Sequence, residues 1–217
     1  MATVATQSDP LPLTKNEFNK LANVSRETSE RLEIYFSILK AWQQKINLVS
    51  TKTLDDVWRR HMLDSIQLIS HIPPAANTIV DLGSGAGFPG LILAIATGQK
   101  IALIESNGRK CAFLREAARQ TNADVDIQNR RIESIKLDDP ADVITARACA
   151  PLSTLLNYSQ NLRAKNGTCL FLKGKDVQQE LTESAKKWNI SHSLHESMSD
   201  SSGAIVKIGA FSKRHGN

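Results

Sequence analysis

The amino-terminal third of the chain has its apolar residues at helical spacing. Between residues 28 and 43, apolar and aromatic side chains recur at steps of three and four, at Leu32, Tyr35, Phe36, Leu39 and Trp42. Such a stripe is typical of a helix that packs against a core. Two prolines at 73 and 74 then end the helical pattern. We therefore expect residues 1–74 to form a helical amino-terminal extension and residues 75–217 to form a second domain.

After residue 75 the pattern changes to short apolar runs that are typical of strands. Helical patterns separate the first five runs, which is the alternation of a parallel sheet, and a polar turn joins the last two, as in an antiparallel pair. The expected strands are 79–82, 100–105, 124–128, 142–145, 168–172, 192–196 and 204–210. The sequence therefore predicts an α/β, Rossmann-like fold of about seven strands.

Four glycines follow the first expected strand, and they can be read in two registers. Gly85, Gly87 and Gly90 fit the dinucleotide spacing G-x-G-x-x-G, which favours NAD. Gly83 already ends the strand, however, and a motif that starts there reads Asp81-x-Gly83-x-Gly85-x-Gly87. This second pattern resembles the S-adenosylmethionine loop of class I methyltransferases. In either register the ligand is expected beyond the carboxyl ends of the strands.

Acidic residues at this edge favour the second register. S-adenosylmethionine carries an ammonium, a carboxylate and a sulfonium but no phosphate, so an acid beside the loop attracts it and would repel a pyrophosphate. Asp81 is such an acid, and Glu105 ends the second strand, where a carboxylate can accept bonds from ribose hydroxyls. Ile132 and Glu133 follow the third strand and are expected to flank the adenine. We predict that these three acids, Ile132 and the loop glycines 83, 85 and 87 bind S-adenosylmethionine.

The chain carries a formal net charge of +5, which favours an acidic partner. Arg59, Arg60 and His61 are consecutive on the last expected helix before the sheet. They form either a solvated face with an Arg60–Asp64 pair or a basic rim that binds a phosphate. Lys173 and Lys175 flank a glycine at the end of the fifth strand, and a role in binding an RNA backbone is as plausible there as an ordinary exposed position.

Arg147 lies among small residues at the end of the fourth strand. It can pair with a cofactor carboxylate or with an RNA phosphate, and a structural salt bridge is the competing interpretation.

The sequence offers no pattern of metal ligands. His61 has no second His, Cys or carboxylate at the spacing of a metal site, and the three cysteines form no C-x-x-C motif, so we expect no metal site. The same cysteines suggest no disulfide framework, so we expect a reducing compartment. With no signal-peptide pattern and no apolar run of membrane-spanning length, we expect a cytoplasmic protein.

The residues that are absent narrow the methyl acceptor. Enzymes that methylate exocyclic amines often carry an Asn/Asp-Pro-Pro-aromatic element after the fourth strand, and the stretch from Thr145 to Pro151 has nothing similar. Cys149 lies there but has no neighbouring base or activating charge, so a covalent role is disfavoured. Guanine N7 presents an in-plane lone pair and needs no deprotonation. The lack of an evident general base therefore favours this acceptor.

Several motifs together resemble the GidB family, also called RsmG. They are Asn47-Leu48-Val49-Ser50, Arg60-His61-x-Leu63-Asp64-Ser65, the loop from Asp81 to Gly90, Thr145-Ala146-Arg147-Ala148 and Leu172-Lys173-Gly174. The resemblance runs from about residue 18 to residue 211. It implies a cytoplasmic bacterial enzyme that methylates N7 of one guanine in small-subunit (16S) ribosomal RNA. It also implies cofactor contacts at Gly83, Phe88, Ile132–Glu133 and Arg147.

Two other functions remain open on the sequence alone. A non-catalytic RNA-binding assembly factor could keep the same fold, and it would differ in failing to bind S-adenosylmethionine. An NAD-dependent oxidoreductase would use the alternative glycine register, although the sequence shows no catalytic Lys/Tyr or His/Asp set for it. For the methyltransferase we expect a monomer whose partner is 16S RNA or the small ribosomal subunit.

Overall fold

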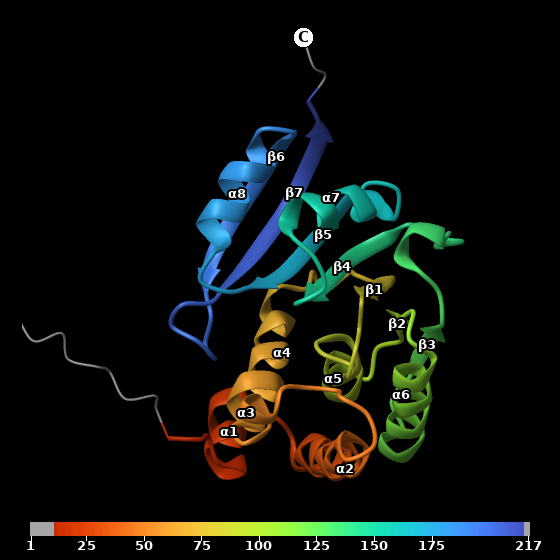
Figure 1. Ribbon diagram of the computed structural model, residues 1–217, viewed down its shortest axis with the longest axis vertical. Coiled ribbons are helices and arrows are strands. Elements are labelled where there is room, and N and C mark those ends of the chain that lie inside the picture. Colours follow the sequence, from red (N-terminus) through yellow and green to blue (C-terminus); the bar gives the residue numbers. More distant parts are fainter. Residues whose placement is uncertain (1–10, 215–217) are drawn as a thin grey trace, which may run out of the picture.

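The structure is a computed structural model that describes residues 11–214. Its centre is a seven-stranded sheet in the order β3-β2-β1-β4-β5-β7-β6 (Figure 1). Strand β7 runs antiparallel to both of its neighbours, and the other pairs are parallel. The strands are β1 (Ile79–Leu82), β2 (Ile101–Ile104), β3 (Val125–Gln128), β4 (Ala141–Arg147), β5 (Arg163–Lys173), β6 (Trp188–Glu196) and β7 (Ala204–Lys213). The predicted α/β fold is confirmed.

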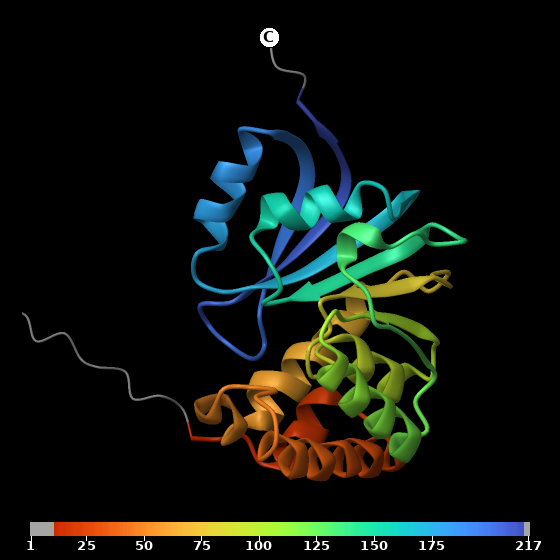
Figure 2. The ribbon, with the colours of Figure 1, turned by 45° about the vertical axis from the view of Figure 1, so that its right-hand side comes forward.

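Helices cover both faces of the sheet (Figure 2). One face packs against α5 (Gly90–Thr97), α6 (Gly108–Thr121) and the amino-terminal helices, and the other packs against α7 (Leu152–Ser159) and α8 (Val177–Ala185). Alternate residues of β1 point to opposite faces of the sheet. Ile79 packs in the core on the first face, and Val80 packs in the core on the second. The parallel strands therefore end together at one edge, between two helical layers.

The first two amino-terminal helices begin with side-chain caps. Thr14 and Glu17 form a capping box at α1 (Lys15–Ala22), and the Ser25 side chain caps α2 (Arg26–Gln43). The remaining helical elements before the sheet are α3 (Thr51–Leu54), η1 (Trp58–Leu63), α4 (Asp64–Ile66) and η2 (Gln67–His71), and a short 3₁₀ turn, η3 (Ile132–Ser134), follows β3.

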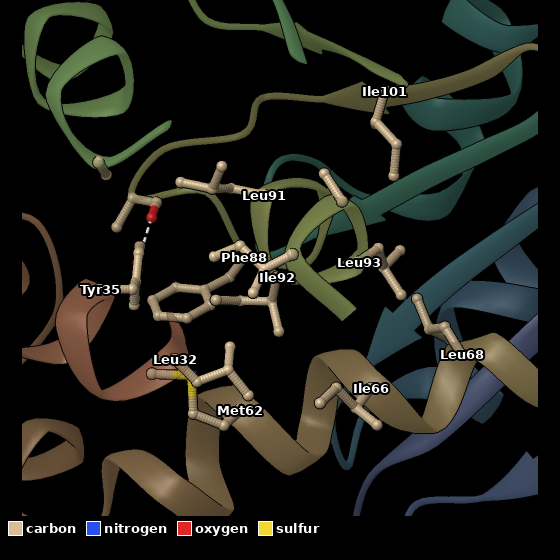
Figure 3. Close-up of a cluster of buried hydrophobic side chains, with 14 of the residues drawn as sticks. Leu32, Tyr35, Met62, Ile66, Leu68, Phe88, Leu91, Ile92, Leu93 and Ile101 are labelled. Carbon is tan, nitrogen blue, oxygen red and sulfur yellow. Dashed lines mark hydrogen bonds between the residues drawn. The ribbon is translucent and has the colours of Figure 1, made fainter. Parts of the chain in front are cut away.

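These helices and one sheet face share a single buried cluster (Figure 3). Leu32 and Tyr35 of α2 are fully buried in the same cluster as Met62 of η1 and Leu91 of α5. The packing is thus continuous across residue 74, and the division of the chain into two domains there stays a prediction. The Tyr35 hydroxyl donates a hydrogen bond to the carbonyl oxygen of Ala86, which ties the glycine loop to α2.

Several expected boundaries are wrong. The last expected helix before the sheet, which carries Arg59, Arg60 and His61, is not one α-helix but a π-helical turn (η1), a short α-helical piece (α4) and a 3₁₀ turn (η2). Strand β6 begins at Trp188 and not at residue 192, and Trp188 is buried against the second core. Strand β5 begins at Arg163 and not at Thr168, since parallel pairing with β4 already starts there.

Candidate functional site

The turn after β1 has a backbone that favours glycine at three positions. Gly83, Gly85 and Gly87 have φ angles of +65°, +57° and +89°, in the left-handed region that L side chains rarely adopt. A Cβ atom added at Gly83 would lie 2.4 Å from Sγ of Cys149. The loop therefore passes directly against the segment that follows β4, and no side chain projects from it at these three glycines.

Asp81 lies beneath this loop and has no exposed surface. The Thr145 hydroxyl of β4 donates to its Oδ1 at 2.7 Å, and its Oδ2 has no hydrogen-bond partner among the described residues. Burial raises the pKa of Asp81 to about 6, and the hydrogen bond from Thr145 opposes that shift. The carboxyl group supports the loop from below, and its direct contact with a cofactor stays a prediction.

Glu105 stands at the end of β2 and joins the loop to the start of α6. Its Oε2 accepts from the backbone N–H of Gly85 at 2.9 Å, and its Oε1 accepts from that of Asn107 at 2.7 Å. Each carboxylate oxygen has a second lone-pair direction, so the group can still accept bonds from two hydroxyls. This carboxylate lies where a pyrophosphate would have to bind the glycine turn. The residues present therefore fit an adenosyl cofactor without phosphate and do not fit a dinucleotide.

Phe88 connects the loop to Arg147 and His61. The Phe88 ring stacks on the imidazole of His61, with ring centroids 4.6 Å apart, and the guanidinium of Arg147 lies 4.7 Å from the same ring. The phenyl ring is only 4% exposed. It therefore serves as the apolar anchor of the loop, and the cofactor contact that the family resemblance implies for it stays a prediction.

Arg147 is the centre of a polar network at the end of β4. Its Nη1 donates to the carbonyl oxygen of Arg60 at 2.9 Å and to Oδ2 of Asp64 at 3.2 Å, and its Nη2 lies 2.7 Å from Nδ1 of His61. The structural salt bridge that competed with a ligand-binding role is thus present. Both roles are compatible, because the same guanidinium also lines a pocket.

His61 is neutral in this network. It is 6% exposed, and burial, followed by the charges of Arg147 and Arg60, lowers its pKa to about 2. Since arginine can only donate, Nδ1 accepts from Arg147, and Nε2 carries the proton and donates to Oγ1 of Thr53 at 3.0 Å. A buried, neutral and fully bonded imidazole does not suit the direct RNA contact that was predicted for it.

The sequence-expected pair between Arg60 and Asp64 is wrong. Arg60 pairs with Asp200 of the β6–β7 loop at 2.6 Å, and Oδ1 of Asp64 accepts from the Ser199 hydroxyl of that loop at 2.6 Å. The π-helical turn changes which residues of this segment share a face. As a result, the loop between β6 and β7 is tied to η1 and α4 by charged and polar bonds.

The other predicted cations are partly engaged. Arg59 pairs with Asp56 at 3.1 Å, and the Lys173 ammonium pairs with Glu180 at 2.7 Å and donates to the carbonyl oxygen of Ala150 at 2.8 Å. The Lys173 side chain is only 8% exposed, whereas Lys175 is fully at the surface. Arg60 and Lys173 line one pocket, and Arg59 lines the neighbouring groove, again with Arg60.

This pocket has a volume of about 420 Å³ and lies at the carboxyl ends of β4 and β5. The walls also include Ala148 and Ala150, the two neighbours of Cys149, whose sulfur packs on Gly83. The glycine turn at residues 83–87 and the pocket therefore lie on two sides of the short segment 148–150. Burial raises the pKa of the Cys149 thiol, which agrees with the expectation that it is not a nucleophile.

Ile132 and Glu133 form part of η3, the turn after β3. Ile132 is half-buried against the second core, and the exposed Glu133 carboxylate accepts from the Tyr158 hydroxyl at 2.9 Å. A backbone hydrogen bond, followed by the hydrogen bond from Tyr158, lowers the pKa of Glu133. The structure keeps this pair at the carboxyl edge of the sheet, and its adenine contact stays a prediction.

The sequence patterns did not assign Thr145, Asp64, Glu180 and Asp200 to this site. The bonding partners of Thr145, Asp64 and Asp200 lie 64, 83 and 140 positions away, so no local pattern joins them. Only Glu180 has a near partner, Lys173, at seven positions.

Within residues 11–214, no three His, Cys, Asp or Glu side chains come together as a metal site. No helix of that range is long and apolar enough to cross a membrane.

Comparison with known proteins agrees with this geometry. In fold, the chain is similar to a glycopeptide N-methyltransferase solved with S-adenosylmethionine, with a TM-score of 0.57 at 9% identity, covering 68% of this chain and 92% of the other. It is also similar to an S-adenosylmethionine-dependent methyltransferase from Aquifex aeolicus, with a TM-score of 0.56 at 16% identity over 73% and 95% of the two chains. The fold is that of the class I methyltransferases, as expected.

Sequence relatives are much closer. The chain is 52% identical to the ribosomal RNA small subunit methyltransferase G of Gluconobacter oxydans, over 89% of this chain and 99% of the relative. It is 51% identical to the protein of the same name from Paramagnetospirillum magneticum, over 86% and 91%. The profile of the family described as GidB, rRNA small subunit methyltransferase G, matches residues 28–208. The chain therefore belongs to the GidB family of S-adenosylmethionine-dependent ribosomal RNA methyltransferases.

Proposed function

We propose that the protein transfers the methyl group of S-adenosylmethionine to N7 of one guanine in 16S ribosomal RNA. The observation that carries the choice of acceptor is the state of His61, which lines the pocket beside the cofactor turn. Its one lone pair accepts from Arg147, and its pKa is about 2, so it does not serve as a general base. An acceptor that already presents a lone pair suits this pocket.

The residues of the chain then have to bind the cofactor and the guanine and to align the methyl group with N7. When bound, S-adenosylmethionine supplies an electrophilic methyl group on its sulfonium. Glu105 accepts from the ribose hydroxyls, the bare backbone from Gly83 to Gly87 lets the amino-acid end approach, and Ile132 with Glu133 flanks the adenine. The pocket beyond Ala148 holds the guanine and excludes water. N7 attacks the methyl carbon through its own lone pair, so no proton transfer is needed. Alignment of the two reactants can then supply up to about 7–11 kcal/mol of the barrier lowering.

The RNA backbone is proposed to follow the two adjoining hollows. Arg60 lines both the pocket and the neighbouring groove, Arg59 lines the groove, and Lys173 also lines the pocket, two positions before the exposed Lys175. Phosphates contact such cations without reading sequence. Because Arg59, Arg60 and Lys173 already pair with Asp56, Asp200 and Glu180, RNA has to compete with carboxylates, and Lys175 is the cation most open to it.

The partner is proposed to be 16S RNA, either free or within the small ribosomal subunit, and the protein to act as a monomer in the cytoplasm. The names of the relatives support the RNA substrate, and the net charge of +5 supports binding to a polyanion. The alternative of a non-catalytic assembly factor on the same fold predicts RNA binding without methyl transfer.

The direct test uses purified protein, S-adenosylmethionine with a labelled methyl group, and either 16S RNA or small subunits from cells that lack the gene. We expect label in one guanine, mapped by mass spectrometry as 7-methylguanine. The variant Gly83→Asp should give no label, whereas Gly98→Ala, at a glycine with open space around it, should give the normal product. RNA binding with no label from the wild-type protein would support the assembly factor instead.

A further inference from the structure

We infer that Glu180 is the residue that selects guanine, by accepting hydrogen bonds from the base edge that lies opposite N7. Glu180 lies in the first turn of α8 and lines the pocket of about 420 Å³. Its side chain is 27% exposed, so it is accessible from that pocket. The inference rests on the proposed function, because it assumes that the acceptor base is a guanine methylated at N7.

One carboxylate oxygen of Glu180 is left for a ligand. Its Oε2 accepts from the backbone N–H of Leu152 at 2.6 Å and from the Lys173 ammonium at 2.7 Å. None of the described residues donates to its Oε1. The bonds to Oε2 fix the carboxylate in place at the start of two helices, and Lys173 offsets the cost of holding a charge in a half-closed pocket. Glu180 is thus a positioned acceptor with an open side.

The other carboxylates that line the pocket are engaged through both of their oxygens. Asp64 accepts from Ser199 through Oδ1 and from Arg147 through Oδ2. Asp200 accepts from Ser202 through Oδ1 and from Arg60 through Oδ2. These two acids hold the β6–β7 loop against η1 and α4. Glu180 is therefore the pocket carboxylate that is free to read a base.

Guanine has the edge that a carboxylate recognises. Its N1–H and its N2 amino group are both donors on one edge, and its N7 lies on the opposite side of the purine. Adenine presents an N1 lone pair on the corresponding edge, which a carboxylate repels. A site whose acceptor bonds to the donors of one base discriminates strongly against a base that lacks these donors, because the buried acceptor is then left unpaired.

The position of Glu180 gives this recognition a direction. Through Leu152 and Lys173 it is bound to the segment after β4, and Cys149 of that segment packs on the cofactor turn at Gly83. A guanine held by Glu180 at its donor edge turns N7 away from α8 and toward the carboxyl end of β1. Base selection and alignment for methyl transfer then depend on the same contact.

The test pairs a change in the protein with a change in one base. Full-length 16S RNA is assembled by ligation with guanosine, inosine or 2-aminopurine riboside at the nucleotide that mass mapping identifies, and kcat/KM is measured for wild type and Glu180→Gln. Inosine lacks the N2 amino group, and 2-aminopurine presents an N1 lone pair in place of N1–H. All three keep N7. Glu183→Gln on the same helix, an exposed residue paired with Lys186, is the matched control.

For the wild type and Glu183→Gln we expect kcat/KM to fall about 10-fold with inosine and about 100-fold with 2-aminopurine. In Glu180→Gln the amide oxygen can keep the bonds to Leu152 and Lys173, which turns an NH₂ donor toward the base. Activity on guanosine should then fall about 100-fold, and the preference for guanosine over 2-aminopurine should shrink at least about 10-fold, because NH₂ pairs with the N1 lone pair.

A purely structural role for Glu180 makes a different prediction, since it would lower activity on the three RNAs by one common factor. That result, or a wild-type protein that uses all three RNAs equally, would overturn the inference while leaving the proposed function intact. A wild-type protein that methylates no guanine N7 in unmodified RNA would overturn both.

Discussion

Nη2 of Arg147 lies 2.7 Å from Nδ1 of His61, and this contact joins the end of β4 to the π-helical turn η1. Both side chains also lie against the ring of Phe88, which belongs to the glycine loop. The contact therefore couples three segments, at residues 61, 88 and 147, that are far apart in the sequence. It forms one wall of the pocket and fixes the tautomer of His61 at the same time.

Arg147→Ala should destabilise the fold by about 2–4 kcal/mol. The change removes three hydrogen bonds and leaves the carboxylate of Asp64, whose side chain is 15% exposed, without its cation. Urea unfolding of wild type, Arg147→Ala, Asp64→Asn and the double variant measures the effect. We expect the two changes to be strongly non-additive, with the double variant little worse than Arg147→Ala. Additive effects would show that the salt bridge contributes nothing.

His61 should give the protein a pH-dependent stability that a variant removes. Its pKa of about 2 lies below the ordinary value of 6.5, so between these values the unfolded chain binds one more proton than the folded one. The stability difference between wild type and His61→Gln should therefore fall by about 1.4 kcal/mol per pH unit as the pH is lowered from 6 to 4. Urea unfolding of both proteins across this pH range measures the stability difference. A difference that does not change with pH would mean that the pKa of His61 is not lowered by folding.

Asp81 should act with the opposite sign over nearly the same range. Its pKa of about 6 lies above the ordinary value of 3.8, so the folded chain binds the extra proton between these values. The stability of wild type relative to Asp81→Asn should fall as the pH rises from 4 to 6. In the wild type the contributions of these two residues to the pH dependence therefore oppose each other. Equal pH profiles for wild type and Asp81→Asn would contradict a raised pKa.

Gly83→Ala should abolish cofactor binding, and Gly98→Ala should not. Both glycines have φ angles near +70°, so both changes introduce similar backbone strain of about 1–2 kcal/mol. Only at Gly83 would the new Cβ meet the Cys149 sulfur, whereas no atom lies within 4 Å at Gly98. Calorimetric titration with S-adenosylmethionine separates the two effects. Normal binding by Gly83→Ala would show that the turn tolerates displacement.

Glu105→Gln should weaken cofactor binding about 10-fold and lower the free energy of unfolding by about 1–3 kcal/mol, because one buried backbone N–H loses its acceptor. Glutamine keeps one oxygen for the N–H of Gly85 or of Asn107, but its NH₂ group turns a donor toward the other amide and toward a ribose hydroxyl. Titration with S-adenosylhomocysteine gives the affinity, and thermal unfolding without ligand serves as the control. An unchanged affinity would remove Glu105 from the cofactor site.

Local patterns predicted the parts of this molecule that depend on neighbours in the sequence. The helical stripe at residues 32–42 and the strand and glycine turn around Gly83 were predicted because spacing and backbone conformation are local properties. The network around Arg147 was not, because its partners come from a segment more than 80 positions away. The Arg60–Asp64 prediction failed for a related reason, since the spacing of four assumes an α-helix and this segment is a π-helical turn.

The most direct test of the account is a crystal structure of the protein with S-adenosylhomocysteine. We expect the ribose hydroxyls to lie within hydrogen-bond distance of Glu105, with the amino-acid end against the backbone from Gly83 to Gly87 and the sulfur facing the pocket lined by Arg147 and Glu180. A ligand bound elsewhere, or one whose sulfur points away from that pocket, would contradict it.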